Sequence, residues 1–182
     1  MSAFEDFEKL YGPADDRIIP GAEQISAYAD LLPEEILQAW RENGWCSYGD
    51  RLLWMVDPGQ FSDIIGDLAE FEKGTPVVFV RSAFAHLYIW CDGAAYSFDV
   101  HHGSLSRVTD NIVVMFMLMC DEEVREKILR SSQYKRMAPA LGPPDRDECY
   151  AFEPALQLGG SGADDTIRRV KIREHLGILS QI

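Results

Sequence analysis

The chain has 182 residues, of which 47% are hydrophobic and 26% charged, a composition typical of one folded domain or two small ones and unlike that of a disordered protein. Seventeen Lys and Arg face thirty Asp and Glu, and this net charge of −13 argues against direct binding to nucleic acid or to an anionic membrane surface, since both are bound through basic residues. The excess lies mainly in residues 1–76, where five basic residues face sixteen acidic ones, which favours a basic partner over a role in solubility alone.

The N-terminal part is predicted to hold three amphipathic helices and one short hairpin. A capping-box pattern at Ser2 and Glu5 begins the first helix, and Gly12 ends it. Gly44 provides a left-handed cap after the second helix, while Asp57 caps the start of the third. The expected ranges are 2–11, 33–43 and 58–72 for the helices and 45–56 for the hairpin, with 13–22 as a loop.

The hydrophobic period changes from helical to alternating after the segment 73–76, which is the best candidate boundary. We therefore expect two subdomains, residues 1–75 and 76–182. The connection is too short to act as a flexible tether, and the first part alone is too small for a stable core, so the two subdomains are expected to share an interface.

The second part is predicted to form an antiparallel sheet followed by helices. Asp92-Gly93 is a typical two-residue hairpin turn, and Asp121 begins an exposed helix. The resulting fold class is α+β, with a helical N-terminal part and its short hairpin packed on the sheet. The expected ranges are 77–81, 86–91, 94–100 and 105–108 for the strands, 112–120 for a buried helix, 147–162 for an irregular segment, 167–172 for a further strand and 175–181 for a terminal helix. A strand is the alternative for the β-branched residues 112–114.

The cysteines and the N-terminus indicate a cytoplasmic protein. Cys46, Cys91, Cys120 and Cys149 are widely spaced and form no zinc-binding pattern, so reduced thiols and no metal or cofactor are expected. The first residues are acidic where a signal peptide would be basic. The longest apolar run is 112–120, well below the roughly 20 residues that span a bilayer.

No constellation in the sequence is clearly catalytic. Asp99, His101 and His102 form the most metal-like cluster, but strand alternation points His102 away from the other two, which favours a polar hairpin tip. The segment 159–162 has neither the Lys of a phosphate loop nor the context of a nucleophile elbow, which favours a turn. Cys149 has no neighbouring His, so a buried thiol is expected. A small metal-dependent or thiol hydrolase using Asp99, His101 and Cys149 stays as the alternative function.

The candidate partner-binding residues are two aromatic side chains and three carboxylates. Tyr48 and Trp54 flank the short hairpin; core positions are more common for such residues, and an interface is the alternative. Asp63, Asp67 and Glu70 recur at i, i+4 and i+7 on the polar face of the third predicted helix. This face is either an ordinary solvated one or an acidic array that a basic, nucleic-acid-binding protein would contact.

Several motifs spread over nearly the whole chain carry a family resemblance. The N-terminal ones are Phe4-x-x-Phe7, Leu32-Pro33-x-x-Ile36-Leu37-x-x-Trp40 and Leu53-Trp54-x-Val56-Asp57-Pro58, and this pattern resembles the GAD-like domain of bacterial proteins. The later ones are Arg81-Ser82-Ala83-Phe84, Leu141-Gly142, the segment 147–160 and Glu174-His175-Leu176, and they are similar to the C-terminal domain that accompanies the GAD-like domain in type VI secretion immunity proteins. The pair Ala85-His86 departs from the Gly-Asp or similar pair expected there.

The resemblance implies an immunity protein that neutralises a secreted bacterial toxin, which in the best-described members is a DNase. It implies no catalytic residues, because the matching positions are structural. The expected mechanism is occlusion, in which carboxylates pair with the Lys and Arg that would hold DNA and a few aromatic residues anchor the interface. A regulatory scaffold with a different partner is a third hypothesis, and it shares the argument from the acidic surface.

Overall fold

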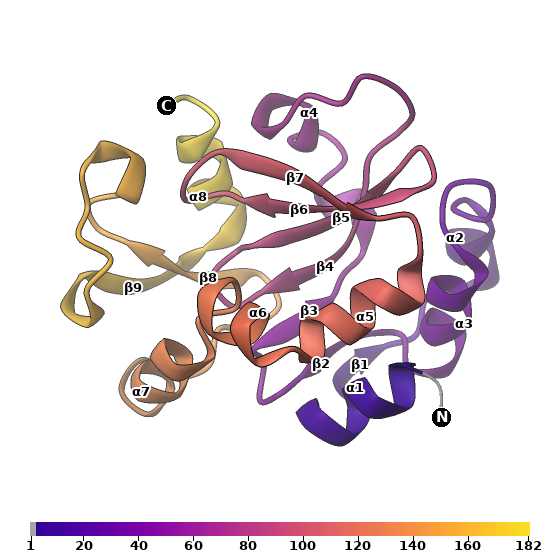
Figure 1. Ribbon diagram of the computed structural model, residues 1–182, viewed down its shortest axis with the longest axis horizontal. Coiled ribbons are helices and arrows are strands. Elements are labelled where there is room, and N and C mark those ends of the chain that lie inside the picture. The colour runs from indigo at the N-terminus through magenta and orange to yellow at the C-terminus, as the bar shows by residue number, and fades with distance from the viewer. Residues whose placement is uncertain (1–2) are drawn as a thin grey trace.

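One seven-stranded antiparallel sheet organises the protein (Figure 1). The computed structural model describes residues 3–182. Every strand pairs with its neighbours in sequence, so the order in the sheet is β1 to β7. The α+β class predicted from the sequence is confirmed. The strands are β1 Asp15–Ile18, β2 Trp45–Tyr48, β3 Leu53–Met55, β4 Val77–Ser82, β5 Leu87–Cys91, β6 Ala94–Asp99 and β7 Ser104–Thr109.

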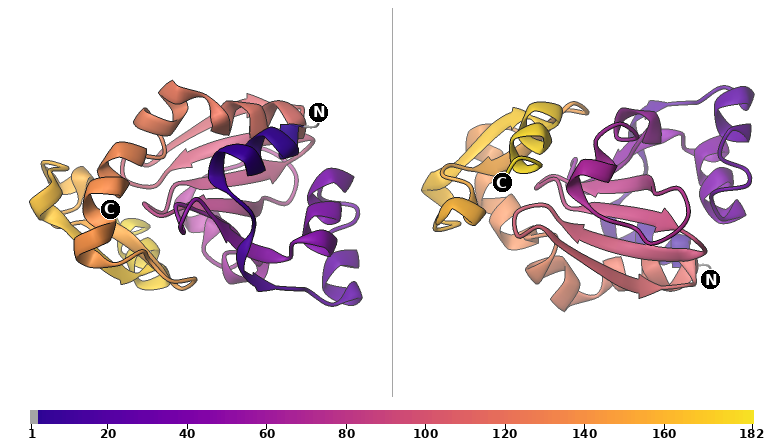
Figure 2. Two further views of the ribbon diagram at one scale, coloured as in Figure 1. Left: turned by 90° about the horizontal axis from the view of Figure 1, so that it is seen from below. Right: turned by 90° about the horizontal axis from the view of Figure 1, so that it is seen from above.

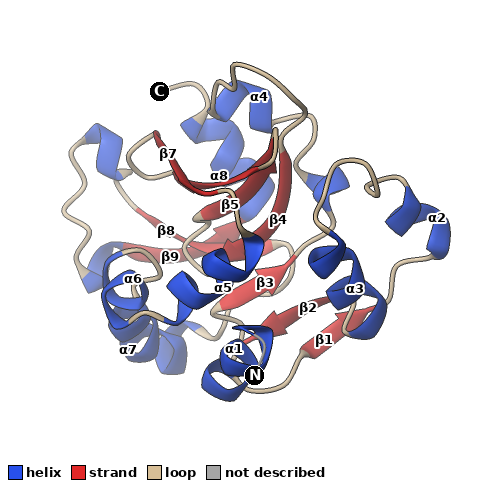
Figure 3. Cartoon of the chain, turned by 45° about the vertical axis from the view of Figure 1, so that its right-hand side comes forward, coloured by secondary structure: helices blue, strands red, loops and turns tan. Residues whose placement is uncertain are grey.

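Helices cover both faces of this sheet, which explains why the central strands β4 and β5 are apolar on both sides. Figure 3 shows α1, α3 and α5 on one face, where Trp40, Phe79 and Phe116 share one core. Segments including α4 and α8 close the other face, where Ile65 and Leu176 share a second core. The helices are α1 Ala3–Tyr11, α2 Ala22–Ser26, α3 Glu34–Glu42, α4 Ile65–Leu68, α5 Ile112–Cys120, α6 Glu122–Lys127, α7 Ser131–Leu141 and α8 Ile172–Leu179, with short 3-10 turns at Pro58–Gln60, Leu156–Leu158 and Asp164–Thr166. None of the helices in residues 3–182 is long and apolar enough to cross a bilayer.

A smaller C-terminal unit is attached to one end of the sheet (Figure 2). It contains the antiparallel pair β8 Glu148–Phe152 and β9 Ile167–Lys171. The Tyr150 N–H donates to the Ala83 carbonyl at 2.7 Å. The buried guanidinium of Arg81 donates to the main-chain carbonyls of Asp145 and Arg146 at 3.0 and 2.8 Å. The Arg81-Ser82-Ala83-Phe84 motif thus joins the sheet to the C-terminal unit.

Most of the predicted regular elements are present. The helix at 33–43 ends as expected, with φ of +75° at Gly44, and the hairpin becomes β2 and β3. The four predicted strands become β4 to β7 within one or two residues. Asp57 caps the turn at 58–60 by accepting the Gly59 N–H at 2.9 Å. Ser2 of the predicted capping box lies outside the described residues.

Several predictions were wrong in detail. The loop expected over 13–22 contains β1, an edge strand, and the helix expected over 58–72 is only a 3-10 turn and the four-residue α4. The irregular segment expected over 147–162 contains β8, and Ile172 begins α8 instead of ending a strand. The helix predicted to begin at Asp121 is present as α6, and Arg130, with a left-handed φ of +53°, separates it from α7.

The sheet runs across the predicted boundary at residue 75. β3 and β4 pair antiparallel through Leu53 with Ser82 and Met55 with Val80. Residues 1–75 therefore supply three strands of a sheet whose other four strands come from residues 76–182.

Candidate functional site

The two aromatic side chains predicted to reach a partner are buried in the core. Tyr48 and Trp54 each expose 1% of their surface. The Tyr48 ring centroid lies 5.1 Å from that of Phe7, and the guanidinium of Arg81 lies 5.3 Å from the Trp54 ring centroid. In contrast to the prediction, neither side chain is accessible to a partner, because both complete the packing of the sheet.

The three predicted carboxylates are exposed but do not form one helical stripe. Asp63 lies in the turn before α4, Asp67 lies in α4, and Glu70 follows it. Arg173 of α8 donates to both carboxylate oxygens of Asp63, at 2.8 and 2.6 Å, and these bonds lower the pKa of Asp63. Asp63 therefore already has a partner within the chain, and only Asp67 and Glu70 stay as candidates for contact with another protein.

The residues of the alternative hydrolase hypothesis do not form an active site. The Asp99 carboxylate accepts the main-chain N–H of His101 at 3.0 Å and lies 2.8 Å from Nδ1 of His102. His101 is buried, and its Nε2–H donates to the Phe84 carbonyl at 2.8 Å. Burial raises the pKa of the Cys149 thiol to about 12, which disfavours a nucleophilic thiolate. Within residues 3–182, no group of three or more His, Cys, Asp or Glu side chains is placed to hold a metal ion.

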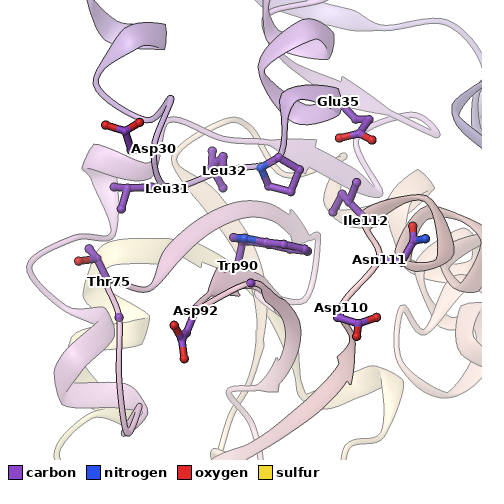
Figure 4. A pocket seen from close by; sticks show the side chains of 13 residues that line it. Asp30, Leu31, Leu32, Glu35, Thr75, Trp90, Asp92, Asp110, Asn111 and Ile112 are labelled. Atoms are coloured by element: carbon purple, nitrogen blue, oxygen red, sulfur yellow. The ribbon is translucent and has the colours of Figure 1, made fainter.

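The structure instead shows an acidic hollow that the sequence did not predict (Figure 4). Its volume is about 670 Å³. The indole of Trp90, 8% exposed, lies between the segment 30–33 and the carboxylates of Asp92 and Asp110. Four chain segments far apart in the sequence line this acidic hollow: Asp30–Pro33 with Glu35, Gly74–Thr75, Trp90 with Asp92–Gly93, and Asp110–Ile112.

Local backbone geometry explains how these segments meet. Asp92 and Gly93 have φ of +47° and +73°, so the tight turn between β5 and β6 presents the Asp92 carboxylate at the rim. Gly74, with φ of +79°, packs against this turn; a Cβ there would lie only 3.1 Å from the Asp92 nitrogen. The Asn111 side chain caps α5 by accepting the Val113 N–H at 2.9 Å, which fixes the last wall.

The charge of the acidic hollow is one-sided. Asp30, Glu35, Asp92 and Asp110 line it together with no Lys or Arg. None of these four carboxylates forms an ion pair within residues 3–182. Four neighbouring like charges repel one another and give the monomer no stability. Carboxylates of this kind suit a bound Lys or Arg side chain, whose charge they would balance.

Two family models together cover almost the whole chain. The model of the GAD-like domain matches residues 2–102. The model of the C-terminal domain of the type VI secretion (T6SS) immunity protein Tdi1 matches residues 110–182, which indicates a type VI secretion immunity protein that binds a toxin. Both parts of the predicted resemblance are confirmed. The acidic hollow lies where the two matched regions meet, since Asp110 and Ile112 belong to the second and its other walls to the first.

A solved structure has the same fold. The crystal structure of Atu4351 from Agrobacterium tumefaciens superposes with a TM-score of 0.83 at 17% sequence identity, covering 98% of this chain and 88% of that one. Comparison with curated proteins finds none that matches the chain.

Proposed function

Because the chain belongs to the GAD-like domain family and continues into an immunity-type C-terminal domain, we propose that it neutralises a type VI secretion nuclease by binding it. Binding takes place in the cytoplasm of the producing cell and covers the active site or the DNA-binding surface of the toxin. The protein acts as a stoichiometric inhibitor and not as an enzyme.

The acidic hollow around Trp90 is the observation that supports this function most directly. A nuclease holds the DNA backbone with Lys and Arg side chains. A side chain of this kind would meet carboxylates on both sides, Asp30 and Glu35 on one and Asp92 and Asp110 on the other, with the indole of Trp90 between them. Once the cation is held there, it is no longer available to DNA.

The asymmetric charge of the chain adds a kinetic contribution. The N-terminal 76 residues carry a net charge of −11, so their field attracts a basic toxin before contact. Such steering raises the association rate and weakens as salt rises. Fast association suits an inhibitor that must capture a toxin before the toxin reaches the genome.

Co-purification with the toxin encoded next to this gene tests the proposal. Tagged wild-type protein is expected to retain that toxin through size-exclusion chromatography as an equimolar complex. The double variant Asp30→Lys/Asp110→Lys is expected to lose it. Both positions have ordinary backbone conformations and exposed side chains, whereas Asp92 has a positive φ at which a substitution would also strain the turn.

The matched control is Asp165→Lys/Glu174→Lys. These exposed carboxylates lie outside the acidic hollow, and their reversal changes the net charge by the same amount. The control variant is expected to bind the toxin normally, and both variants are expected to keep the thermal midpoint of the wild type. Loss of binding in both variants would show a dependence on net charge alone, and a wild-type protein that does not bind the toxin would overturn the proposal.

A further inference from the structure

Helix α5 carries an apolar face that residues 3–182 leave exposed. The nine residues Ile112–Cys120 include no charged side chain, and the sequence therefore predicts a buried helix. Ile112, Met115, Phe116 and Met119 do face the core. On the outer side, however, Val113, Val114 and Met117 are exposed, with Met117 at 58%. A soluble monomer gains nothing from such a face, and contiguous exposed apolar side chains mark interaction surfaces.

A groove lies beside this apolar face of α5. The groove has a volume of about 260 Å³ and runs between α3 and α5, with Phe4 of α1 at its edge. Val113 and Phe116 supply the apolar wall, and Glu35, Gln38 and Glu42 of α3 supply the polar one. We call the groove and the exposed side of α5 the α5 surface.

The α5 surface is continuous with the acidic hollow. Glu35 and Ile112 line both depressions, so an acidic site and an apolar site lie side by side. The groove, like the acidic hollow, is built from both matched family regions. Phe4 and α3 belong to the region 2–102, and α5 belongs to the region 110–182. A single bound segment that carries a basic residue next to apolar ones would fill both.

The charge around the groove selects among possible occupants. Glu35 and Glu42 lie along one wall, and no Lys or Arg lines it. A second copy of the chain would bring the same acidic walls together across a two-fold axis, which costs free energy. An anionic membrane surface would be repelled in the same way. A basic segment with apolar anchors is the occupant whose charge is complementary.

We propose that the α5 surface binds an amphipathic segment of the toxin whose apolar side chains enter the groove while its Lys or Arg side chains pair with Glu35, Glu42 and the acidic hollow. This inference rests on the proposed function and adds to it the chemistry of the bound segment. The apolar anchors supply most of the affinity, because desolvated central contacts dominate interfaces, and the carboxylates supply orientation and rate.

The test is the double variant Val113→Gln/Met117→Gln. Glutamine suits a helix, carries no charge and removes the apolar surface without altering the electrostatic field. The matched control is Leu158→Gln/Ile178→Gln, which polarises two exposed side chains elsewhere; Ile178 is as exposed as Met117, at 58%. The equilibrium Kd for the neighbouring toxin is measured by calorimetry, and thermal unfolding checks that each variant is folded.

The inference predicts a Kd increase of about tenfold or more for Val113→Gln/Met117→Gln and no change for the control. If Val113→Gln/Met117→Gln binds as the wild type does while Asp30→Lys/Asp110→Lys does not, the inference is overturned and the proposed function stands. If the wild-type protein itself does not bind, the proposed function fails as well. A wild-type dimer that becomes monomeric in Val113→Gln/Met117→Gln, with unchanged toxin affinity, would assign the α5 surface to self-association and overturn the inference.

Discussion

Because of three buried histidines, we expect the stability of the protein to depend on pH between 7 and 5. His86, His101 and His175 are each less than a tenth exposed. Burial lowers the pKa of each below the ordinary 6.5, to about 4 for His86, about 3 for His101 and about 4 for His175. His101 also lies beside His175, with ring centroids 5.5 Å apart, and Arg130 opposes protonation of His86 and His101, while Asp99 favours it.

The direction and size of the effect follow from proton binding. Below pH 6.5 the unfolded chain takes up protons at these histidines while the folded protein does not, so the free energy of unfolding falls as the pH falls. Because pH 5 lies about 1.5 units below the unfolded pKa of 6.5 and above the three folded values, each histidine lowers the free energy of unfolding by about 2 kcal/mol there. Three such groups give about 6 kcal/mol, a large part of the roughly 5–15 kcal/mol that stabilises a domain. Carboxylates contribute little in this window, since they stay ionised in both states.

Urea denaturation at pH 7, 6 and 5 measures the effect. The variant His175→Phe isolates one histidine. The buried Nε2 of His175 has no hydrogen-bond partner within residues 3–182, so the substitution breaks no hydrogen bond at this atom. It is expected to lose about 2 kcal/mol less than the wild type between pH 7 and 5. The variant Leu158→Gln/Ile178→Gln, which keeps every histidine, is the control and should lose as much stability as the wild type between pH 7 and 5. Equal wild-type stability at pH 7 and 5 would refute the reasoning.

Four further predictions concern the fold and the acidic surface. Arg81→Met should lower the free energy of unfolding by about 3 kcal/mol in urea titrations, because it removes both hydrogen bonds from the buried guanidinium to the main-chain carbonyls of Asp145 and Arg146. Residues 1–75 alone should show no cooperative thermal unfolding, since β3 loses β4, and the full chain should unfold in one transition; two transitions would contradict this. Cys149 should react with a thiol reagent only after denaturation, and rapid labelling of the native protein would contradict its burial. Asp67→Lys/Glu70→Lys should slow toxin association at low salt while changing stability by less than about 0.5 kcal/mol at each position; an unchanged association rate would place the interface elsewhere.

Local patterns predicted the elements that local interactions determine. The strands of the second part are rich in β-branched and aromatic residues and are separated by turn residues such as Asp92-Gly93, and all four are present. The helix at 33–43 has its apolar stripe and its left-handed Gly44, and it is present too. These features arise from neighbouring residues, so a single sequence is enough to find them.

Elements that depend on distant partners were predicted poorly. The apolar spacing over 58–72 is helical, but Ala69 is already extended, and the segment packs its apolar residues on the sheet without a long helix. β1 is polar and becomes a strand only because β2 offers it an edge. Tertiary contacts decided both cases.

The candidate site had almost no local signal. The acidic hollow takes its walls from four segments between Asp30 and Ile112, and each carboxylate alone resembles an ordinary surface residue. Trp90 is nearly buried, so nothing in the sequence separates it from an ordinary core aromatic residue. The one informative sign was the excess of acidic residues in the N-terminal part, which predicted the sign of the surface but not its location.

The most direct test of the central claim is a titration of the nuclease activity of the neighbouring toxin with this protein. The account predicts that plasmid cleavage falls to background at one equivalent of wild-type protein, and that it continues at one equivalent of the Asp30→Lys/Asp110→Lys variant. Cleavage that continues with wild-type protein in excess, or protection by the variant equal to that by the wild type, would contradict it.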